Sequence, residues 1–510
     1  MEKKPISRRD FIKAFGVTAG ASVLAACAPQ TVEVVKTQVV EKIVKETQLV
    51  EQTSVVKETQ IVQQVVTATP LPTKVPEPAV LDIWWNTDIP DLTTAKWTND
   101  PKDPVFAKEW NWGGLARAAY LPWLEKHPGV SLKITGHSWD AELRMNQLLA
   151  IAAGNIPDTS LGEAYVTEFV RLGVYSPVSD ASAALFPKGP ITGCIVEGKA
   201  YGLPESSGTN ALAINLDVVA KAGLPTDKFP TTWDELLADA QAVSKKNYTA
   251  KWGNNGYYCY GPAPTYGTAM RILPWFNQNG AQLDDDNGHP TANSDKAVET
   301  WLYHNQLMWT STKNLVLQAE SEAGSGKLFG DGVIAYKLGW SNDFTSVGEM
   351  GTNAVAVSLP MPPGGQPGNI VIGNTIISPL KGGKNPDLAI THVEEVWTQV
   401  EAQAFLAEKA GIWIPALKSL LDQWETYDRL DAYKTDTAKK MVRVTMKELL
   451  GNAKPVPSWT KNGANIWNEW NNTYQRIWSG EDGKLVGGMK QADIKTQLDK
   501  LQQYILDQTK

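Results

Sequence analysis

The amino-acid sequence predicts an α/β fold, and three observations support this prediction. Residues 211–215 are a small apolar run after a loop of Ser, Gly, Thr and Asn, which is typical of a buried strand entered from a turn. Two helices follow. Gly223 ends a short one that starts at Asp217, and Thr231 or Thr232 caps the next, with Glu235 three residues after Thr232 as a capping box. The chain has 510 residues. Because domains usually hold about one to two hundred, two lobes with appendages are expected.

The N-terminus has the features of an export signal. The segment S-R-R-D-F-I-K from Ser7 is close to the twin-arginine pattern, and the apolar run over 15–26 is too short to span a membrane. The run ends in L-A-A-C, a lipobox in which the cysteine becomes lipidated and forms the new N-terminus. We therefore predict a signal peptide over 1–26, twin-arginine export of the folded chain, and an extracytoplasmic protein anchored to the cell membrane through Cys27.

A stalk and a linker precede the folded part. Residues 31–69 are low in complexity: K-E-T-Q-L-V at 45–50 returns as K-E-T-Q-I-V at 57–62, and the apolar pairs fit no single heptad. The stalk is predicted to be helical or extended, with an oligomerising helix as the alternative, and we expect a monomer. Four prolines then stiffen the linker. Residues 27–79 are therefore predicted to form the lipid anchor, stalk and linker.

Predicted strands and helices alternate over the rest of the chain. The first strand, 79–85, runs into the polar loop 86–88, and ligands bind at that end of a strand in open α/β sheets. A helix over 142–153 ends at Gly154. The other predicted helices cover 115–127, 268–279, 295–308, 386–410, 435–450, 466–478 and 494–506, and the other strands cover 131–135, 333–338, 354–363 and 370–377.

The composition and the motifs argue against several functions. A formal net charge of −7 disfavours general nucleic-acid binding. The sequence has no G-x-S-x-G, H-E-x-x-H, P-loop or C-x-x-C motif, and its five histidines are scattered. Residues 284–287 lack the order and the later glutamate of a calcium loop. We predict no catalytic residue, no metal and no cofactor, and we expect Cys194 and Cys259 to be free, buried thiols.

Tryptophan is the strongest chemical signal in the sequence, which has 20 Trp against 10 Phe. Trp is hard to bury fully, so many of these residues are expected to be partly exposed or to line clefts. A pyranose ring presents C–H faces on which flat aromatic rings stack, and hydroxyls that Asp, Glu, Asn and Gln bind. The composition therefore suits a carbohydrate ligand.

Several segments carry a recognisable pattern. They are G-K-A-Y-G-L-P from Gly198, with A-L-A-I-N-L-D-V-V-A-K-A-G-L and P-T-T-W-D-E-L-L-A-D-A-Q-A-V after it, L-L-A-I-A-A-G-N-I-P-D at 148–158, F-G-D-G-V-I-A-Y at 329–336 and P-V-P-S-W at 455–459. Together they resemble the sugar-type extracellular solute-binding proteins of ABC importers, the maltose-binding-protein family. The resemblance is patchy from about residue 80 to the C-terminus, and an insertion over 90–114 has no counterpart in it.

The resemblance implies a two-lobed periplasmic-binding-protein fold with hinge crossings between the lobes. The crossings are expected near 210–215, 370–375 and 413–416. Lobe one is expected to comprise 80–210 with 375–415, and lobe two 215–370 with 416–510. Aromatic and polar residues at matching positions contact sugar in the family. This implies the ligand contacts Trp85, Asp88, Tyr165, Trp275, Trp340 and Trp459.

The function that the resemblance implies is capture of a sugar or oligosaccharide and its delivery to ABC permease subunits, without enzymatic activity and without nucleic acid. Two alternatives stay open. An extracellular carbohydrate-active enzyme would need two carboxylates about 5 to 9.5 Å apart. A binding protein for a quaternary amine osmolyte would use Trp clusters through cation–π contacts. For Trp340, we expect Gly339 to turn the backbone so that the indole faces the ligand and is wet without it.

Overall fold

The computed structural model describes residues 78–85, 116–137, 140–162, 166–245, 255–258, 269–284, 289–312, 328–341, 343–371, 375–405, 408, 414–431, 433–455, 463–479 and 490–509. The chain divides into residues 1–73 and one compact unit over 74–510. The predicted signal peptide, Cys27, the stalk and the insertion over 90–114 lie outside the described residues. Within the described ranges, no helix combines the length and the apolar character needed to cross a membrane.

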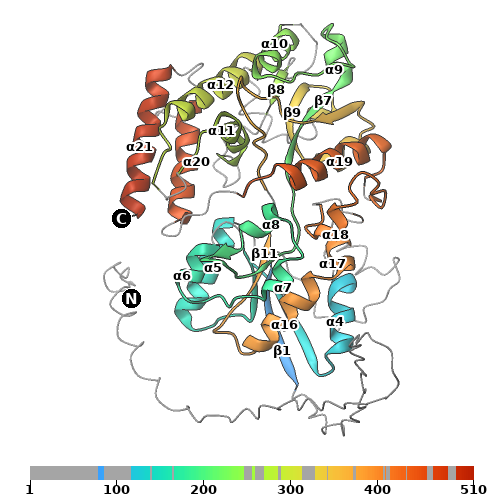
Figure 1. The fold of residues 1–510 in the computed structure, drawn as a ribbon, viewed down its shortest axis with the longest axis vertical. Coiled ribbons are helices and arrows are strands. Elements are labelled where there is room, and N and C mark those ends of the chain that lie inside the picture. The colour runs from blue at the N-terminus through green and yellow to red at the C-terminus, as the bar shows by residue number, and fades with distance from the viewer. Residues whose placement is uncertain are drawn as a thin grey trace, which may run out of the picture. The chain divides into compact units, whose positions relative to one another are not determined.

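The first large sheet contains β1 and β11, which are labelled in Figure 1. Its strand order is β2-β1-β3-β11-β6. Its strands are β1 (Ala79–Trp85), β2 (Val130–Gly136), β3 (Thr159–Gly162), β6 (Leu203–Pro204) and β11 (Ile376–Pro379). β1 is parallel to β2 and β3, whereas β11 is antiparallel to both β3 and β6. β1, β2, β3 and β6 therefore end at one edge of the sheet, which is the usual ligand-binding edge of open α/β sheets.

Helices and a short hairpin pack around this sheet, and aromatic side chains form part of its core. The other elements on its side are η1 (Ala116–Tyr120), α4 (Leu121–Lys126), α5 (Asp140–Ala153), α6 (Val166–Arg171), α7 (Asp180–Ala183), α8 (Lys188–Thr192), the hairpin of β4 (Ile195–Val196) and β5 (Lys199–Ala200), α16 (Pro386–Trp397) and α17 (Val400–Phe405). Trp397 stacks on Trp85, with ring centroids 5.6 Å apart, and meets Tyr120 edge-on. Cys194 is a free, buried thiol, as predicted, while Cys259 lies outside the described residues.

Two of the recognisable sequence segments are explained by contacts within this part of the fold. A Cβ at Gly202, in G-K-A-Y-G-L-P, would lie 2.5 Å from Ser378 Oγ, so glycine lets the chain before β6 approach β11. Asp158, the last residue of G-N-I-P-D, is buried. Its carboxylate accepts hydrogen bonds from Asp82 N at 2.9 Å and from Asn385 N at 2.6 Å. These donors compensate for the burial of its charge, so Asp158 ties β1 to the start of α16.

The second large sheet has the order β10-β7-β9-β8 (Figure 1). Its strands are β7 (Asn210–Asn215), β8 (Asn255–Tyr258), β9 (Ile334–Trp340) and β10 (Ala354–Val357). The helices on its side are α9 (Leu216–Lys221), α10 (Trp233–Ser244), η2 (Ala269–Ile272), α11 (Leu273–Asn279), α12 (Asp295–Thr312), α15 (Asp343–Glu349), α19 (Asp436–Gly451), α20 (Gly463–Ser479) and α21 (Gln491–Thr509). Thr232 and Glu235 form the predicted capping box, and Gly223 has a left-handed φ of 81°.

The chain passes between the two sheets in three places. Two passages join β6 to β7 and β10 to β11. The third crossing is predicted at 413–416. Beyond it, Lys418 N, at the start of α18 (Lys418–Leu421), donates to Leu185 O on the side of the first sheet, and α18 also contacts α19, which packs on β7 and β10. Because α18 contacts elements on both sides, the place of the third crossing and the bounds of the two lobes stay predictions.

Candidate functional site

Four chain segments run side by side between the two sheets, and we call them the hinge segments. They are 205–210, 369–371 with 375, 414–416 and 452–455. Ser207 pairs with Ile414, and Ile370 pairs with Lys454. Thr209 Oγ1 donates to Ile370 O at 2.7 Å. Because these segments come from four distant parts of the chain, residues on them can contact a ligand held between the two sheets.

Glu205 directly follows β6, at the edge of the first sheet where β1 and β3 also end. Its side chain is only 1% exposed. Thr375 Oγ1 donates to Glu205 Oε2 and lies 3.0 Å from Ser206 Oγ. Burial raises the pKa of Glu205 to about 7, and the hydrogen bonds from Thr375 and Ser206 offset part of that rise. Near neutral pH this carboxyl group therefore exists in both protonation states.

Trp340 is the corresponding residue at the end of β9, and it pairs with Asn210 of β7. The guanidinium of Arg271 lies 4.2 Å from the centroid of the indole. Trp340 N donates to Asp343 Oδ2 at 3.0 Å, and Lys337 Nζ lies 2.6 Å from the same oxygen. Asp343 thus fixes the end of β9 next to the hinge segments.

Buried polar atoms without a hydrogen-bond partner gather along this part of the described structure. They are Glu205 Oε1, Ser207 Oγ, Asn210 Nδ2, Trp340 Nε1 and Ser341 Oγ. Buried polar atoms in folded proteins normally have partners, so a group of unpaired ones needs an explanation. The set contains a carboxylate acceptor, amide and indole donors, and hydroxyls that do both. A neutral ligand with many hydroxyl groups would satisfy all of them.

The structure places three of the six predicted ligand residues. Trp85 ends β1 at the edge of the first sheet but is fully buried against Trp397. Trp275 is fully buried in the core beside the second sheet, 6.1 Å from the ring of Trp233. Trp340 is 3% exposed. The remaining three lie outside the described residues: Asp88, Tyr165 and Trp459. As ligand contacts, all six stay predictions.

The expected role of Gly339 is wrong, and so is the expected wet indole of Trp340. Gly339 does not turn the backbone: it lies inside β9, paired with Ala211. A Cβ at this position would lie 2.8 Å from Phe344 Cε1, so glycine is needed for close packing. Trp340 is packed under Arg271. The sequence could not reveal this, because Phe344 and Arg271 reach these residues only through the fold.

Sequence reasoning missed four residues of this site, namely Glu205, Ser207, Asn210 and Arg271. The sequence predicts the run E-S-S-G-T-N after Pro204 only as a loop that leads into a strand. Its signal was available: the run is polar, yet short buried strands enclose it on both sides. A polar segment that must be buried is expected to carry function. Arg271 gave no such signal.

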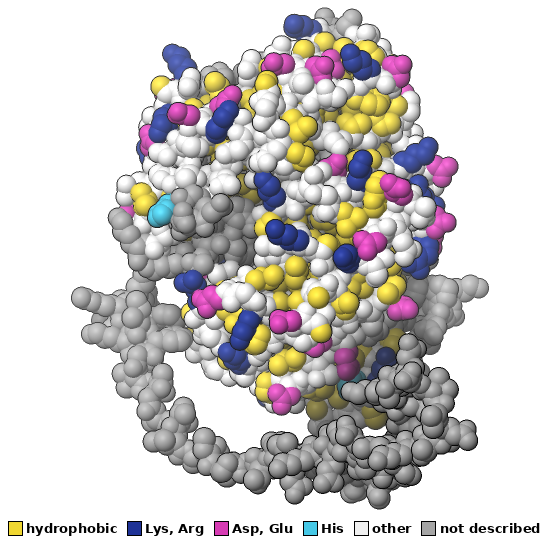
Figure 2. Space-filling view, viewed as in Figure 1, with side chains coloured by type: hydrophobic (Ala, Val, Ile, Leu, Met, Phe, Trp, Pro, Cys, Tyr) yellow, Lys and Arg dark blue, Asp and Glu magenta, His cyan; other side chains and the backbone are white. Residues whose placement is uncertain are grey.

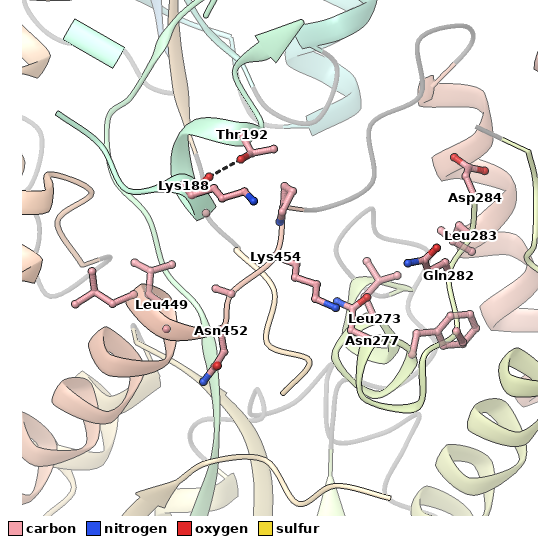
Figure 3. Close-up of a pocket in the computed structure, with 17 residues that line it drawn as sticks. Lys188, Thr192, Leu273, Asn277, Gln282, Leu283, Asp284, Leu449, Asn452 and Lys454 are labelled. Atoms are coloured by element: carbon pink, nitrogen blue, oxygen red, sulfur yellow. Dashed lines mark hydrogen bonds between the residues drawn. The ribbon is translucent and has the colours of Figure 1, made fainter. Parts of the chain in front are cut away.

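A hollow lies beside the hinge segment 452–455, between α8 of the first sheet and α11 and α19 of the second (Figure 3). Its volume is about 680 Å³. Lys188, Lys454 and Asn277 lie around it, and it contains none of the predicted ligand residues. A Cβ at Gly189 would lie 3.0 Å from Ala453 O, so α8 touches the hinge here. The unpaired buried atoms favour the side of Glu205 and Trp340 as the candidate site.

Comparison with known protein sequences gives one family and several partial relatives. The model of the bacterial extracellular solute-binding proteins matches residues 103–408. The arabinooligosaccharide-binding protein of Bacillus subtilis (strain 168) is 27% identical over 208 residues, which are 38% of this chain and 45% of that protein. A putative binding protein of Brucella abortus (strain 2308) is 30% identical over 157 residues, 28% of this chain and 38% of its own. The matched part thus spans less than half of each relative.

Solved structures resemble this chain over most of its length. Maltose-bound MalE3 of T. maritima has a TM-score of 0.60 at 17% identity and covers 84% of this chain and 100% of its own. The GacH receptor of Streptomyces glaucescens, solved with acarbose, has a TM-score of 0.61 at 17% identity, with 85% and 100% covered. The cyclic alpha-maltosyl-1,6-maltose binding protein of Arthrobacter globiformis has a TM-score of 0.63 at 14% identity, with 84% and 99% covered. At these identities the likeness establishes the fold, and the predicted two-lobed fold is confirmed.

Proposed function

Because this chain belongs to the bacterial extracellular solute-binding proteins, we propose that it captures a sugar or oligosaccharide outside the cytoplasm and delivers it to an ABC importer. The observation that carries the proposal is the set of unpaired buried polar atoms along the hinge, from Glu205 to Ser341. The names of relatives support the ligand class, since one binds arabinooligosaccharides and others were solved with maltose or acarbose.

The proposed mechanism is capture by closure of two lobes. Glu205 and Ser207 lie next to the first sheet, whereas Trp340 ends a strand of the second sheet and Ser341 follows it. A ligand that contacts both groups binds the closed arrangement more tightly than the open one, and this difference in affinity drives closure. The closed form is then the one that docks on the permease. Trp85, Asp88, Tyr165, Trp275 and Trp459 are proposed as further contacts.

The site favours a sugar over a quaternary amine. A methylated ammonium group would need the open face of an aromatic ring. The guanidinium of Arg271 already covers Trp340 at 4.2 Å. The unpaired Asn210 Nδ2 and Trp340 Nε1 are donors, which suit hydroxyl oxygens and offer nothing to a cation.

On the face in Figure 2, Lys and Arg lie interspersed with Asp and Glu, so this face offers a nucleic acid no basic patch to bind.

A thermal-shift screen of the purified protein tests the function. We expect malto- or arabinooligosaccharides to raise the melting temperature, since a ligand at 100 times its Kd adds about 2.7 kcal/mol of stability. Choline and glycine betaine should leave it unchanged. Chromatography after prolonged incubation should recover the oligosaccharide intact. Shortened products would instead favour the carbohydrate-active enzyme, and a shift with glycine betaine alone would favour the amine.

We also propose that residues 1–26 are removed after twin-arginine export and that lipidated Cys27 anchors the protein to the membrane. Replacing Cys27 by serine should then move the protein from the membrane to the soluble fraction, or block its maturation, because serine cannot carry the thioether-linked lipid. Fractionation with metabolic lipid labelling measures this. Cys194→Ser is the matched control and should stay membrane-bound, since that thiol is buried. Unchanged fractionation of Cys27→Ser would refute the anchor.

A further inference from the structure

We propose that ligand capture expels a proton from Glu205, so that the affinity for oligosaccharide depends on pH. The inference rests on the function proposed above and concerns the regulation of the same site. A ligand hydroxyl donates a hydrogen bond to Glu205 Oε1, and the carboxyl proton leaves to the solvent buffer. No bond of the ligand breaks. Each ligand that binds a protein molecule with protonated Glu205 releases one proton to the buffer, so the step balances.

The position of Glu205 is the first support. The residue directly follows the last position of β6 and is the first residue of the hinge segment that enters β7. Glu205 N donates to Thr375 O at 2.8 Å, which joins two hinge segments. Oε2 accepts a hydrogen bond from Thr375 Oγ1, but Oε1 has no hydrogen-bond partner among the described residues. A buried carboxyl oxygen that is left unpaired in the absence of ligand is a ready acceptor for a ligand hydroxyl.

Among the residues that the structure describes, the titratable groups found near Glu205 supply no positive charge. Tyr120, at the end of η1, is neutral, since burial and the nearby Glu205 raise its pKa well above the usual range. His392 of α16 stacks on the Tyr120 ring, and burial lowers its pKa to about 3, so it is also neutral. Thr375 and Ser206 offer only hydroxyls. Within the described part of the chain, the Glu205 carboxylate therefore has no cationic partner that would keep it ionised.

The sign of the pH dependence follows from these contacts. Burial holds the pKa of the ligand-free Glu205 at about 7. A hydrogen bond donated by the ligand favours the carboxylate, so the pKa falls in the complex. Binding is then strongest above the ligand-free pKa and weakens as pH falls through it. Between the two pKa values, linkage of one proton changes the affinity by about tenfold per pH unit.

Calorimetric titration of the full-length protein with the best oligosaccharide from the screen tests this. The wild-type Kd should fall about tenfold from about pH 5.5 to 6.5 and level off above about pH 8. The measured enthalpy near pH 6.5 should vary with the ionisation enthalpy of the buffer, which reports proton release. Glu205→Gln should remove both effects. The Glu168 carboxylate pairs with Arg144 away from the hinge and provides the control. The Glu168→Gln variant should keep both the pH dependence of the affinity and the proton release.

Thr375→Val provides a second variant that keeps the carboxyl. It removes a hydroxyl that stabilises the carboxylate, so the midpoint of the affinity curve should move to higher pH. A wild-type affinity that does not vary with pH would overturn the inference and leave the proposed function intact. So would a Glu205→Gln variant that keeps the wild-type slope. A wild-type protein that binds no oligosaccharide at any pH would refute the proposed function, and this inference with it.

Discussion

Replacing Trp340 by alanine should cost the ligand-free protein about 3–5 kcal/mol of unfolding free energy, the usual cost of removing a core tryptophan. The indole is 3% exposed and packs against Arg271, so its loss leaves a cavity at the end of β9. The same variant should bind oligosaccharide roughly ten- to a hundredfold more weakly per folded molecule, by analogy with other aromatic stacking and edge contacts. Urea unfolding measures the first effect, and calorimetry corrected for the folded fraction measures the second.

Trp301 provides the matched control for this experiment. It is fully buried beside the second sheet, with its ring 5.7 Å from that of Trp470, and it lies away from the hinge segments. Trp301→Ala should show a similar loss of stability with an unchanged affinity per folded molecule. If Trp340→Ala behaves in the same way as Trp301→Ala, then Trp340 is a core residue and does not belong to the ligand site.

Removing the carboxylate of Asp343 should cost roughly 3–5 kcal/mol, because it leaves Lys337 buried without its partner charge. The Lys337 side chain is 1% exposed and its Nζ lies 2.6 Å from Asp343 Oδ2. Asp343 also accepts the hydrogen bond of Trp340 N. Asp343→Ala should therefore weaken ligand binding as well, since it releases the strand end that positions the indole. Denaturant unfolding and calorimetry measure the two effects.

A double-mutant cycle separates the ion pair from the packing around it. Lys337→Met combined with Asp343→Leu should recover much of the stability that Asp343→Ala loses, because an apolar pair of similar volume leaves no buried charge. The exposed pair Lys495 and Asp499 is the control: Asp499→Ala should cost less than about 1 kcal/mol. A cost of that small size for Asp343→Ala would show that Lys337 reaches solvent or another partner.

The sequence determined the elements whose partners lie close along the chain. The capping box of Thr232 and Glu235 and the left-handed Gly223 depend on residues within a few positions of each other. Their hydrogen bonds can be read from spacing alone. The family-like segments extended this to the two-lobed fold, which the comparisons confirm.

The burial of the tryptophan side chains could not be predicted from the sequence. Nearly all the Trp side chains that the structure describes are buried, although the excess of Trp was expected to mark clefts and partly exposed positions. A large flat ring suits a sugar face and a protein core equally well. Trp85 is buried because Trp397, from a distant helix, stacks on it. Only the packing of distant segments distinguishes these two uses.

The tertiary structure also decided the chemistry of the candidate site. The amino acid at position 205 is evident from the sequence, but two properties of its carboxyl exist only because distant segments meet at the sheet edge. One is its burial, which raises its pKa, and the other is the hydrogen bond from Thr375, which offsets part of that rise. Local hydrogen bonds are set by neighbours in the sequence, whereas burial and the pairing of polar atoms are set by segments that meet only when the chain has folded.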